Sequence, residues 1–323
     1  MQIIRGINFE RNIEKIFQKM IKNGELNWTI NKVPRHLISW ANDELDRGNV
    51  AAVDGTNMYP INLISGVFCQ VGVGGISYIK DEPSINVQSI TSYINQKISE
   101  EEYFYNILNG KDKRLSKKDI LTAMSYWEFE HCLKRNEDWI FKDGNIVPFH
   151  LLWHPEGLSL LEKVVSSKKI IGIIKSSRSP KYNLLGRFLK PGEYMTIEDA
   201  SKFYFTMKKQ EFGPPSSLIQ SYTKDAQEFL TNYAESIKRG VFKTGQKSYV
   251  YEIPKKFFEK GIALIMADSM RNPRGLPFLI DLVDLRLSSL FENNVYQNKM
   301  QNILLEQGEL FENINEREMR DWY

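Results

Sequence analysis

Acidic residues follow two apolar segments of this sequence. Their positions at the ends of apolar segments predict that these acidic side chains are largely buried. One apolar segment runs directly into Asp54 and Gly55, and a second leads to Asp143 and Gly144. A carboxylate at the tip of a buried strand is costly unless it is paired or bound to a metal. The repeated pattern predicts two acids at neighbouring strand ends. Capping of the loop that follows is the simpler alternative for Asp54.

The helix expected at about 116–133 carries an acid on the face that neighbouring elements should cover. On a helical wheel, Glu128 shares a stripe with Met124 and Cys132, whereas Glu130 points to the opposite side. A glutamate on a covered face needs a positive neighbour, and a lysine at the rim would serve as well as a metal ion. Glu130 is expected to be an ordinary solvated glutamate.

The last large helix, expected at about 278–290, keeps its acids on one narrow stripe. Asp281, Asp284 and Ser288 lie on one face at i, i+3 and i+7, and the remaining positions are mostly apolar. Carboxylates on a largely buried helix call for a counter-charge. A metal ion would supply it.

Together these acids are typical of a site for hard divalent cations. The four candidate ligands are Asp54, Glu128, Asp143 and Asp284. Carboxylates without cysteine or paired histidine ligands favour Mg²⁺ or Mn²⁺. Two such ions close together activate water and stabilise the leaving oxygen in phosphodiester cleavage. Lys175, after another apolar strand, is predicted to emerge at the same sheet edge and to meet a phosphate or tune a carboxylate, although a lysine reaching for solvent is the simpler alternative.

The composition is that of a globular protein with a sizeable core. The chain has 323 residues, of which 42% are hydrophobic and 26% charged. Its formal net charge of +3 is too small to identify a partner. Two cysteines, Cys69 and Cys132, argue against a disulfide scaffold. No signal pattern and no apolar run of about 20 residues is present, so we expect a cytoplasmic protein.

The order of the predicted elements indicates an α/β protein. A helical arm at 1–49 precedes one domain at 50–323, in which closely spaced strands begin the sheet as antiparallel hairpins. A strand, a helix and a strand between 139 and 174 favour a right-handed parallel crossover. The segment 177–247, which mixes lysines with aromatic residues, is expected to be an insertion and suits nucleic acid only weakly.

Three local expectations concern where strands bend or end. Gly55 is expected to turn the chain sharply where the first strand stops. The glycines at 72–75 are expected to mark a bend, bulge or turn. The apolar segment Ile262–Met266 is interpreted as a strand.

In this order the residues resemble the successive sequence blocks of the NurA nucleases. The match runs from about residue 50 to residue 290, most of the chain. The blocks are Ala52–Thr56, Glu128, Ile140–Ile146, Ile171–Ser176 and Gly275–Asp284.

The resemblance implies an RNase H-like mixed sheet flanked by helices, with peripheral insertions. It implies a divalent-metal deoxyribonuclease, Mn²⁺- or Mg²⁺-dependent with two ions, that acts on DNA ends as a 5′–3′ exonuclease. It also implies a homodimer and a HerA-type hexameric ATPase as partner, in DNA repair or antiviral defence. Carried over by position, Asp54, Glu128 and Asp143 would be metal ligands.

Two positions depart from the family pattern and keep alternatives open. Asp284 falls where many members have histidine, and Leu276 where many have tyrosine. The first change keeps a side chain that can bind a metal, whereas the second removes a hydroxyl. A catalytically decayed DNA-binding or adaptor subunit is therefore the alternative to a nuclease. An enzyme of the same fold acting on RNA or on branched junctions is a third possibility.

Overall fold

The chain forms two compact units, each assembled from separate stretches of sequence. Unit 1 comprises Met1–Arg47, Phe141–Ile146 and Lys169–Phe278, and unit 2 comprises Gly48–Ile140, Val147–Lys168 and Leu279–Tyr323. The computed structural model describes residues 15–17, 19–20, 23, 28–58, 61–63, 66–79, 84–93, 117–152, 155–177, 179–201, 220–234, 236–291 and 294–306. The interleaved boundaries mean that segments far apart in the sequence build each unit.

Unit 1 is built on antiparallel strands that are buried over most of their length. Tyr251 lies opposite Gly240 on one side and opposite Ile173 on the other, so β10 is paired along both edges. Aromatic and β-branched residues fill these strands, as is typical of a pleated surface covered by other elements. The strands, in spatial order, are β1 (Ile30–Lys32), β8 (Glu193–Asp199), β9 (Ile237–Lys243), β10 (Ser248–Pro254) and β7 (Lys169–Ile174).

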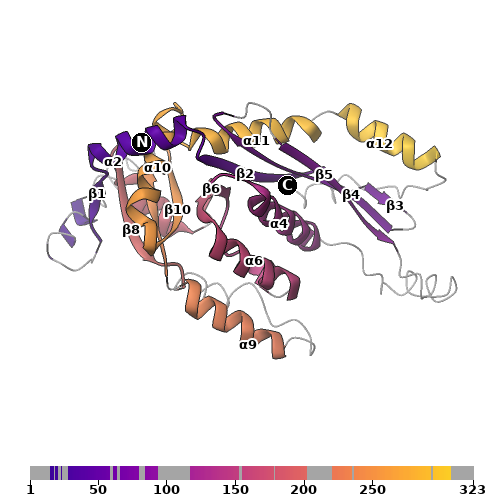
Figure 1. The fold of residues 1–323 in the computed structure, drawn as a ribbon, viewed down its shortest axis with the longest axis horizontal. Coiled ribbons are helices and arrows are strands. Elements are labelled where there is room, and N and C mark those ends of the chain that lie inside the picture. The colour runs from indigo at the N-terminus through magenta and orange to yellow at the C-terminus, as the bar shows by residue number, and fades with distance from the viewer. Residues whose placement is uncertain are drawn as a thin grey trace, which may run out of the picture. The chain divides into compact units, whose positions relative to one another are not determined.

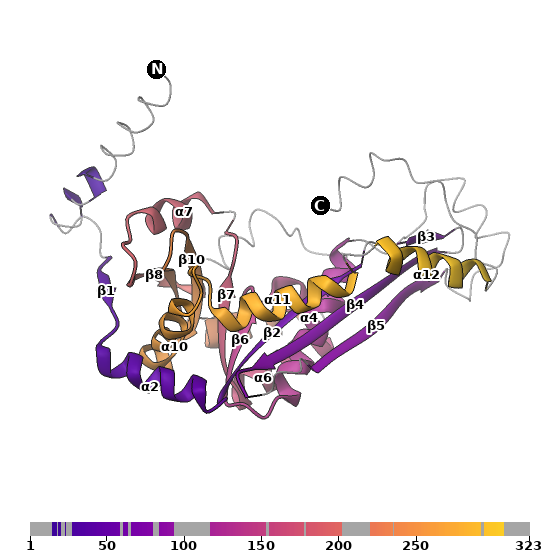
Figure 2. The same ribbon diagram turned by 90° about the horizontal axis from the view of Figure 1, so that it is seen from above.

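Helices cover the sheet of unit 1. α10 packs against α2 and against β10, and α7 packs against β9 and β10 (Figure 2). The segment 177–247 supplies β8 and β9 to this sheet. The helices of the unit are α2 (Arg35–Asp46), α7 (Pro180–Arg187), α9 (Gln220–Phe229), η2 (Leu230–Ala234), η3 (Lys255–Phe257) and α10 (Phe258–Met270).

The prediction of a strand at Ile262–Met266 is wrong, because these residues form the middle of the helix α10. All five are buried, so their apolar character carries no strand or helix periodicity. Alanine, leucine and methionine are strong helix formers, and the helix extends well beyond the apolar run on both sides.

Unit 2 is an antiparallel sheet with helices packed on it. β2 pairs with β4 from Ala51 to Asn57, β5 runs along β4, and α4 packs against both β2 and β4 (Figure 1). Its elements are β2 (Val50–Asn57), β3 (Ile61–Leu63), β4 (Gly66–Ser77), β5 (Ser84–Tyr93), α4 (Lys117–Lys134), α5 (Phe149–Leu152), α6 (Pro155–Ser167), α11 (Phe278–Phe291) and α12 (Asn294–Glu306). β6 (Trp139–Asp143) begins in unit 2 and ends in unit 1.

Two expectations about the strands of unit 2 are wrong. β2 does not stop at Gly55 but continues to Asn57, in unbroken register with β4. The glycines at 72–75 cause no bend or bulge and lie inside this regular ladder. Gly75 lies against α4, because a Cβ atom on it would be 2.9 Å from His131 Nε2.

The expected α/β fold, a sheet flanked by helices, is confirmed. The predicted helices at α2, α4, α6 and α11 and the antiparallel start of the sheet are present. Of the N-terminal arm, residues 15–17 and 19–20 are helical, and much of the remaining helix expected there lies outside the described residues. No helix among the described residues is long and apolar enough to cross a bilayer.

Candidate active site

Asp54 and Glu128 both lie next to Gly55 in unit 2. Asp54 lies within β2 and is 3% exposed, and its Oδ1 accepts a hydrogen bond from the Gly55 N–H at 2.8 Å. Glu128 lies on α4 and is 4% exposed. A Cβ atom on Gly55 would be 2.8 Å from Glu128 Oε1, so the glutamate carboxylate lies directly against this glycine. Two buried carboxylates therefore contact the same residue.

The local sequence explains this approach. The same hypothetical Cβ on Gly55 would be 2.7 Å from Met124 Cγ, so α4 packs closely on β2 only because residue 55 has no side chain. Met124 and Glu128 are one helical turn apart and share a face. The glycine that the sequence suggested as a turn thus serves as the contact point for a helix.

Asp143 and Lys175 form an ion pair in unit 1. Lys175 Nζ is 3.1 Å from Asp143 Oδ2, and the two side chains are 24% and 25% exposed. Gly144 follows with φ +89°, a backbone conformation that favours glycine, and its N–H donates to the Ile173 carbonyl at 2.8 Å. The Asp-Gly pattern therefore turns the chain toward β7, and the predicted proximity of Asp143 and Lys175 is present.

A buried ion pair fixes the chain just after Asp143, and sequence reasoning did not identify it. Arg239 and Glu252 are 2% and 0% exposed and form a hydrogen-bonded ion pair. Glu252 Oε2 also accepts from the Ile146 N–H at 2.7 Å, and Arg239 donates to Asn145 Oδ1 at 3.1 Å. The position of Glu252 inside the apolar strand Tyr249–Ile253 was the signal that was available, because the same reasoning had singled out Asp54.

Asp284 lies on α11 of unit 2 with intermediate exposure, as does Asp281 one turn earlier. The face of α11 that carries the two aspartates is therefore partly exposed to solvent. Nearby Leu285 is 67% exposed. Among the described residues, no three histidine, cysteine, aspartate or glutamate side chains lie close enough together to hold a metal ion.

One turn after Glu128, His131 is held in its neutral form at pH 7. Burial lowers its pKa to about 4, and the nearby charges of Arg135 and Lys134 act in the same direction. Its Nε2 atom would lie 2.9 Å from a Cβ on Gly75, so the ring packs on β4. His131 is therefore a packing residue with a suppressed charge.

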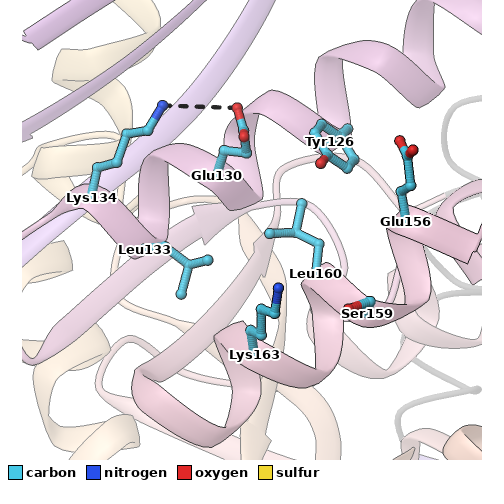
Figure 3. A pocket seen from close by; sticks show the side chains of 8 residues that line it. All are labelled: Tyr126, Glu130, Leu133, Lys134, Glu156, Ser159, Leu160 and Lys163. Carbon is cyan, nitrogen blue, oxygen red and sulfur yellow. Dashed lines mark ion pairs between the residues drawn. The ribbon is translucent and has the colours of Figure 1, made fainter.

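Glu130 faces away from Glu128, as predicted. It lines an open pocket of about 490 Å³ between α4 and α6, where its carboxylate pairs with Lys134 at 3.8 Å (Figure 3). Both acidic and basic side chains line this pocket. Glu156 and Lys163 reach into it from α6 (Figure 3). Glu130 is an ordinary surface glutamate, and it provides a matched control for Glu128.

The known proteins that resemble this chain identify its family. The NurA domain matches residues 48–259, about two thirds of the sequence. The chain belongs to the NurA family. The matched region includes Asp54, Glu128, Asp143 and Lys175 and ends before Leu276 and Asp284. No curated protein matches the chain.

Solved structures give distant matches to this NurA-family chain. A NurA crystal structure with bound dAMP and manganese is 12% identical, with a TM-score of 0.48 over 88% of this chain and 92% of that one. A NurA structure without a named ligand is 12% identical, with a TM-score of 0.46 over 86% and 94%. The catalytic domain of human endonuclease V is 10% identical, with a TM-score of 0.35 over 94% and 98%.

Proposed function

We propose that this chain is a divalent-metal-dependent deoxyribonuclease. The observation that carries the proposal is that two buried carboxylates, those of Asp54 and Glu128, both lie against Gly55 within a NurA domain. Buried carboxylates are costly unless they are paired or bound to a metal ion. Their oxygen atoms suit Mn²⁺ or Mg²⁺, and NurA crystal structures have been solved with manganese.

Each residue has a separate part in this proposal. Asp54 and Glu128 hold the metal, and Asp143 and Asp284 are further proposed ligands because of the family pattern. When bound, two divalent ions would supply an activated water and stabilise the leaving oxygen. The Gly55 N–H fixes one Asp54 oxygen, and the packing of α4 on β2 fixes Glu128. Lys175 orients Asp143 and adds positive charge that suits a substrate phosphate.

Family resemblance supports the finer parts of the proposal. We propose that the substrate is a DNA end, degraded 5′ to 3′, and that the protein acts as a homodimer. A HerA-type hexameric ATPase would be the partner that moves the DNA, in DNA end processing or antiviral defence. No phosphate-binding glycine loop is present in the sequence, so the motor would be a separate chain.

The direct test is DNA degradation by the purified full-length protein with Mn²⁺. We expect Asp54→Asn and Glu128→Gln each to lower the rate by on the order of 100-fold, because each keeps the shape of the side chain and removes a charged ligand. Glu130→Gln is the matched control, because it makes the same change two residues along the same helix on the exposed face. It should cleave at the wild-type rate.

Different results would separate the proposals. Equal rates for the wild type and Asp54→Asn would contradict a role for this site in cleavage. Leu276, at the position where many family members have tyrosine, keeps the adaptor alternative as the second candidate. That alternative predicts DNA binding without metal and no cleavage with either Mn²⁺ or Mg²⁺. Competition between DNA and RNA substrates would test for an enzyme that acts on RNA.

A further inference from the structure

Unit 1 contains a cavity lined by positive side chains, next to the Asp143–Lys175 pair. The cavity has a volume of about 490 Å³ and lies between α7, the end of β7 and the β9–β10 hairpin. Its charged lining residues are Lys175, Arg187, Lys243 and Lys247, and none of its lining residues is acidic. The pocket between α4 and α6 has the same volume but mixes glutamates with lysines. A purely cationic lining is therefore a specific feature of the cavity in unit 1.

Two of these lysines have no acidic partner in the part of the chain that the structure describes. Neither Lys243 nor Lys247 forms an ion pair there. Glu193 lies opposite Lys243 in the β8–β9 ladder, but its carboxylate accepts from the Lys190 N–H at 2.8 Å and lies 4.0 Å from Lys32. Positive charges gathered around a concave space repel one another unless an anion binds there.

The lining indicates which anion fits. Lysine and arginine are the side chains that bind phosphate oxygens, and the hydroxyl and amide groups of Ser177 and Asn183 add hydrogen-bonding groups. The volume lies within the range of about 300–1,000 Å³ that is typical of small-ligand sites. A phosphate with part of its nucleotide therefore fits both the charge and the size of the cavity.

We propose that this cavity binds a backbone phosphate of a nucleic-acid strand, next to the Asp143–Lys175 pair. Lys175 lines the cavity and also pairs with Asp143, so the cavity adjoins this candidate ligand within unit 1. The inference rests on the proposed function for its substrate class. It adds a strand-holding site that includes Arg187, Lys243 and Lys247, none of which is a candidate metal ligand.

The test measures DNA binding without cleavage. The full-length protein is titrated in EDTA against a short single-stranded DNA with a 3′ fluorescent label, and anisotropy is recorded at several salt concentrations. We expect Lys243→Gln/Lys247→Gln to raise the Kd by about 10-fold or more and to reduce the salt slope by about 1.4, since each lost phosphate contact on single-stranded DNA contributes about 0.7. Lys243→Arg/Lys247→Arg should bind as the wild type does.

The matched control is Lys190→Gln/Lys256→Gln, which removes the same charge from exposed positions of unit 1 outside the cavity. It should lower affinity much less than the cavity variant. Equal affinities for the wild type and both double variants, or equal losses in both variants, would overturn the proposal. In the second case, net charge alone would explain binding.

Competitors identify the source of the phosphate. Probes with and without a 5′ phosphate separate a terminal phosphate from an internal one, and a loss in the cavity variant with either probe supports the proposal. dAMP and inorganic phosphate are then added to the wild type. If they bind in a manner that depends on Lys243 and Lys247 while the DNA strand does not, the cavity is a mononucleotide site and the proposal is wrong.

Failure of the nuclease proposal would look different. A wild type that binds DNA through Lys243 and Lys247 but cleaves nothing with Mn²⁺ contradicts the nuclease and leaves the strand site supported. If the wild type cleaves DNA and the cavity variant has an unchanged Kd and KM, the strand-holding site is contradicted. The nuclease proposal is then still supported.

Discussion

At the scale of single residues, His131 makes stability depend on pH. Its pKa is about 4 in the folded protein against an ordinary 6.5. As pH falls below 6.5, His131 becomes protonated in the unfolded chain but stays neutral in the folded protein. The free energy of unfolding therefore decreases. The stabilisation is complete above pH 6.5 and is lost as pH falls toward 4. Partial exposure reduces the effect, and we expect this residue to contribute about 1 kcal/mol of lost stability between pH 7 and pH 5.

Urea unfolding at the two pH values would measure this effect in the wild type and in His131→Asn. The variant should lose less stability on acidification, because its side chain does not titrate. His36→Asn is the control, because it removes a histidine from the exposed face of α2. An identical pH response in His131→Asn and the wild type would contradict the assignment.

At the scale of elements, the buried ion pair between β9 and β10 is expected to dominate the stability of unit 1. Arg239→Met leaves the Glu252 charge buried without its partner, which costs about 3–5 kcal/mol. Lys255→Met is the control, because it breaks the exposed pair with Asp199, 3.0 Å long with side chains 44% and 39% exposed. That change should cost less than about 1 kcal/mol. Similar losses in both variants, measured by urea unfolding, would show that burial does not set the cost.

The pattern of apolar and charged residues in the sequence predicted the helices and strands of the candidate site. It was less successful for the contacts between these elements. The stripe on α4 correctly separated covered Glu128 from exposed Glu130, since helix geometry alone decides which side chains share a face. The segment Ile262–Met266 was assigned wrongly because a residue run buried on all sides has no periodicity to distinguish helix from strand.

Contacts between distant segments explain what sequence reasoning missed. The need for glycine at position 55 comes from α4, more than sixty residues later in the chain, and the sequence around Gly55 carries no sign of that contact. The pairing of Arg239 with Glu252 depends on the β9–β10 register. A charged residue inside an apolar strand indicates that a partner exists, but it does not identify the partner.

At the scale of the whole molecule, metal binding should stabilise the folded protein whether or not DNA is cleaved. A ligand that binds only the folded state adds RT ln(1 + [L]/Kd), which is about 2.7 kcal/mol at 100 times Kd. For a chain of this size we expect Mn²⁺ at 100 times Kd to raise the Tm by roughly 4 °C over the value in EDTA. The rise should disappear in Asp54→Asn and Glu128→Gln and persist in Glu130→Gln.

This measurement separates metal ligation from catalysis. Asp143→Asn and Asp284→Asn tested in the same way would show which of the remaining proposed ligands contribute to metal binding, since a true ligand reduces the Tm rise even when cleavage is already absent. An equal rise in the wild type and in Asp54→Asn would mean that Mn²⁺ binds elsewhere on the surface. The carboxylates of Asp54 and Glu128 beside Gly55 would then be structural groups, and the case for the nuclease would rest on family membership alone.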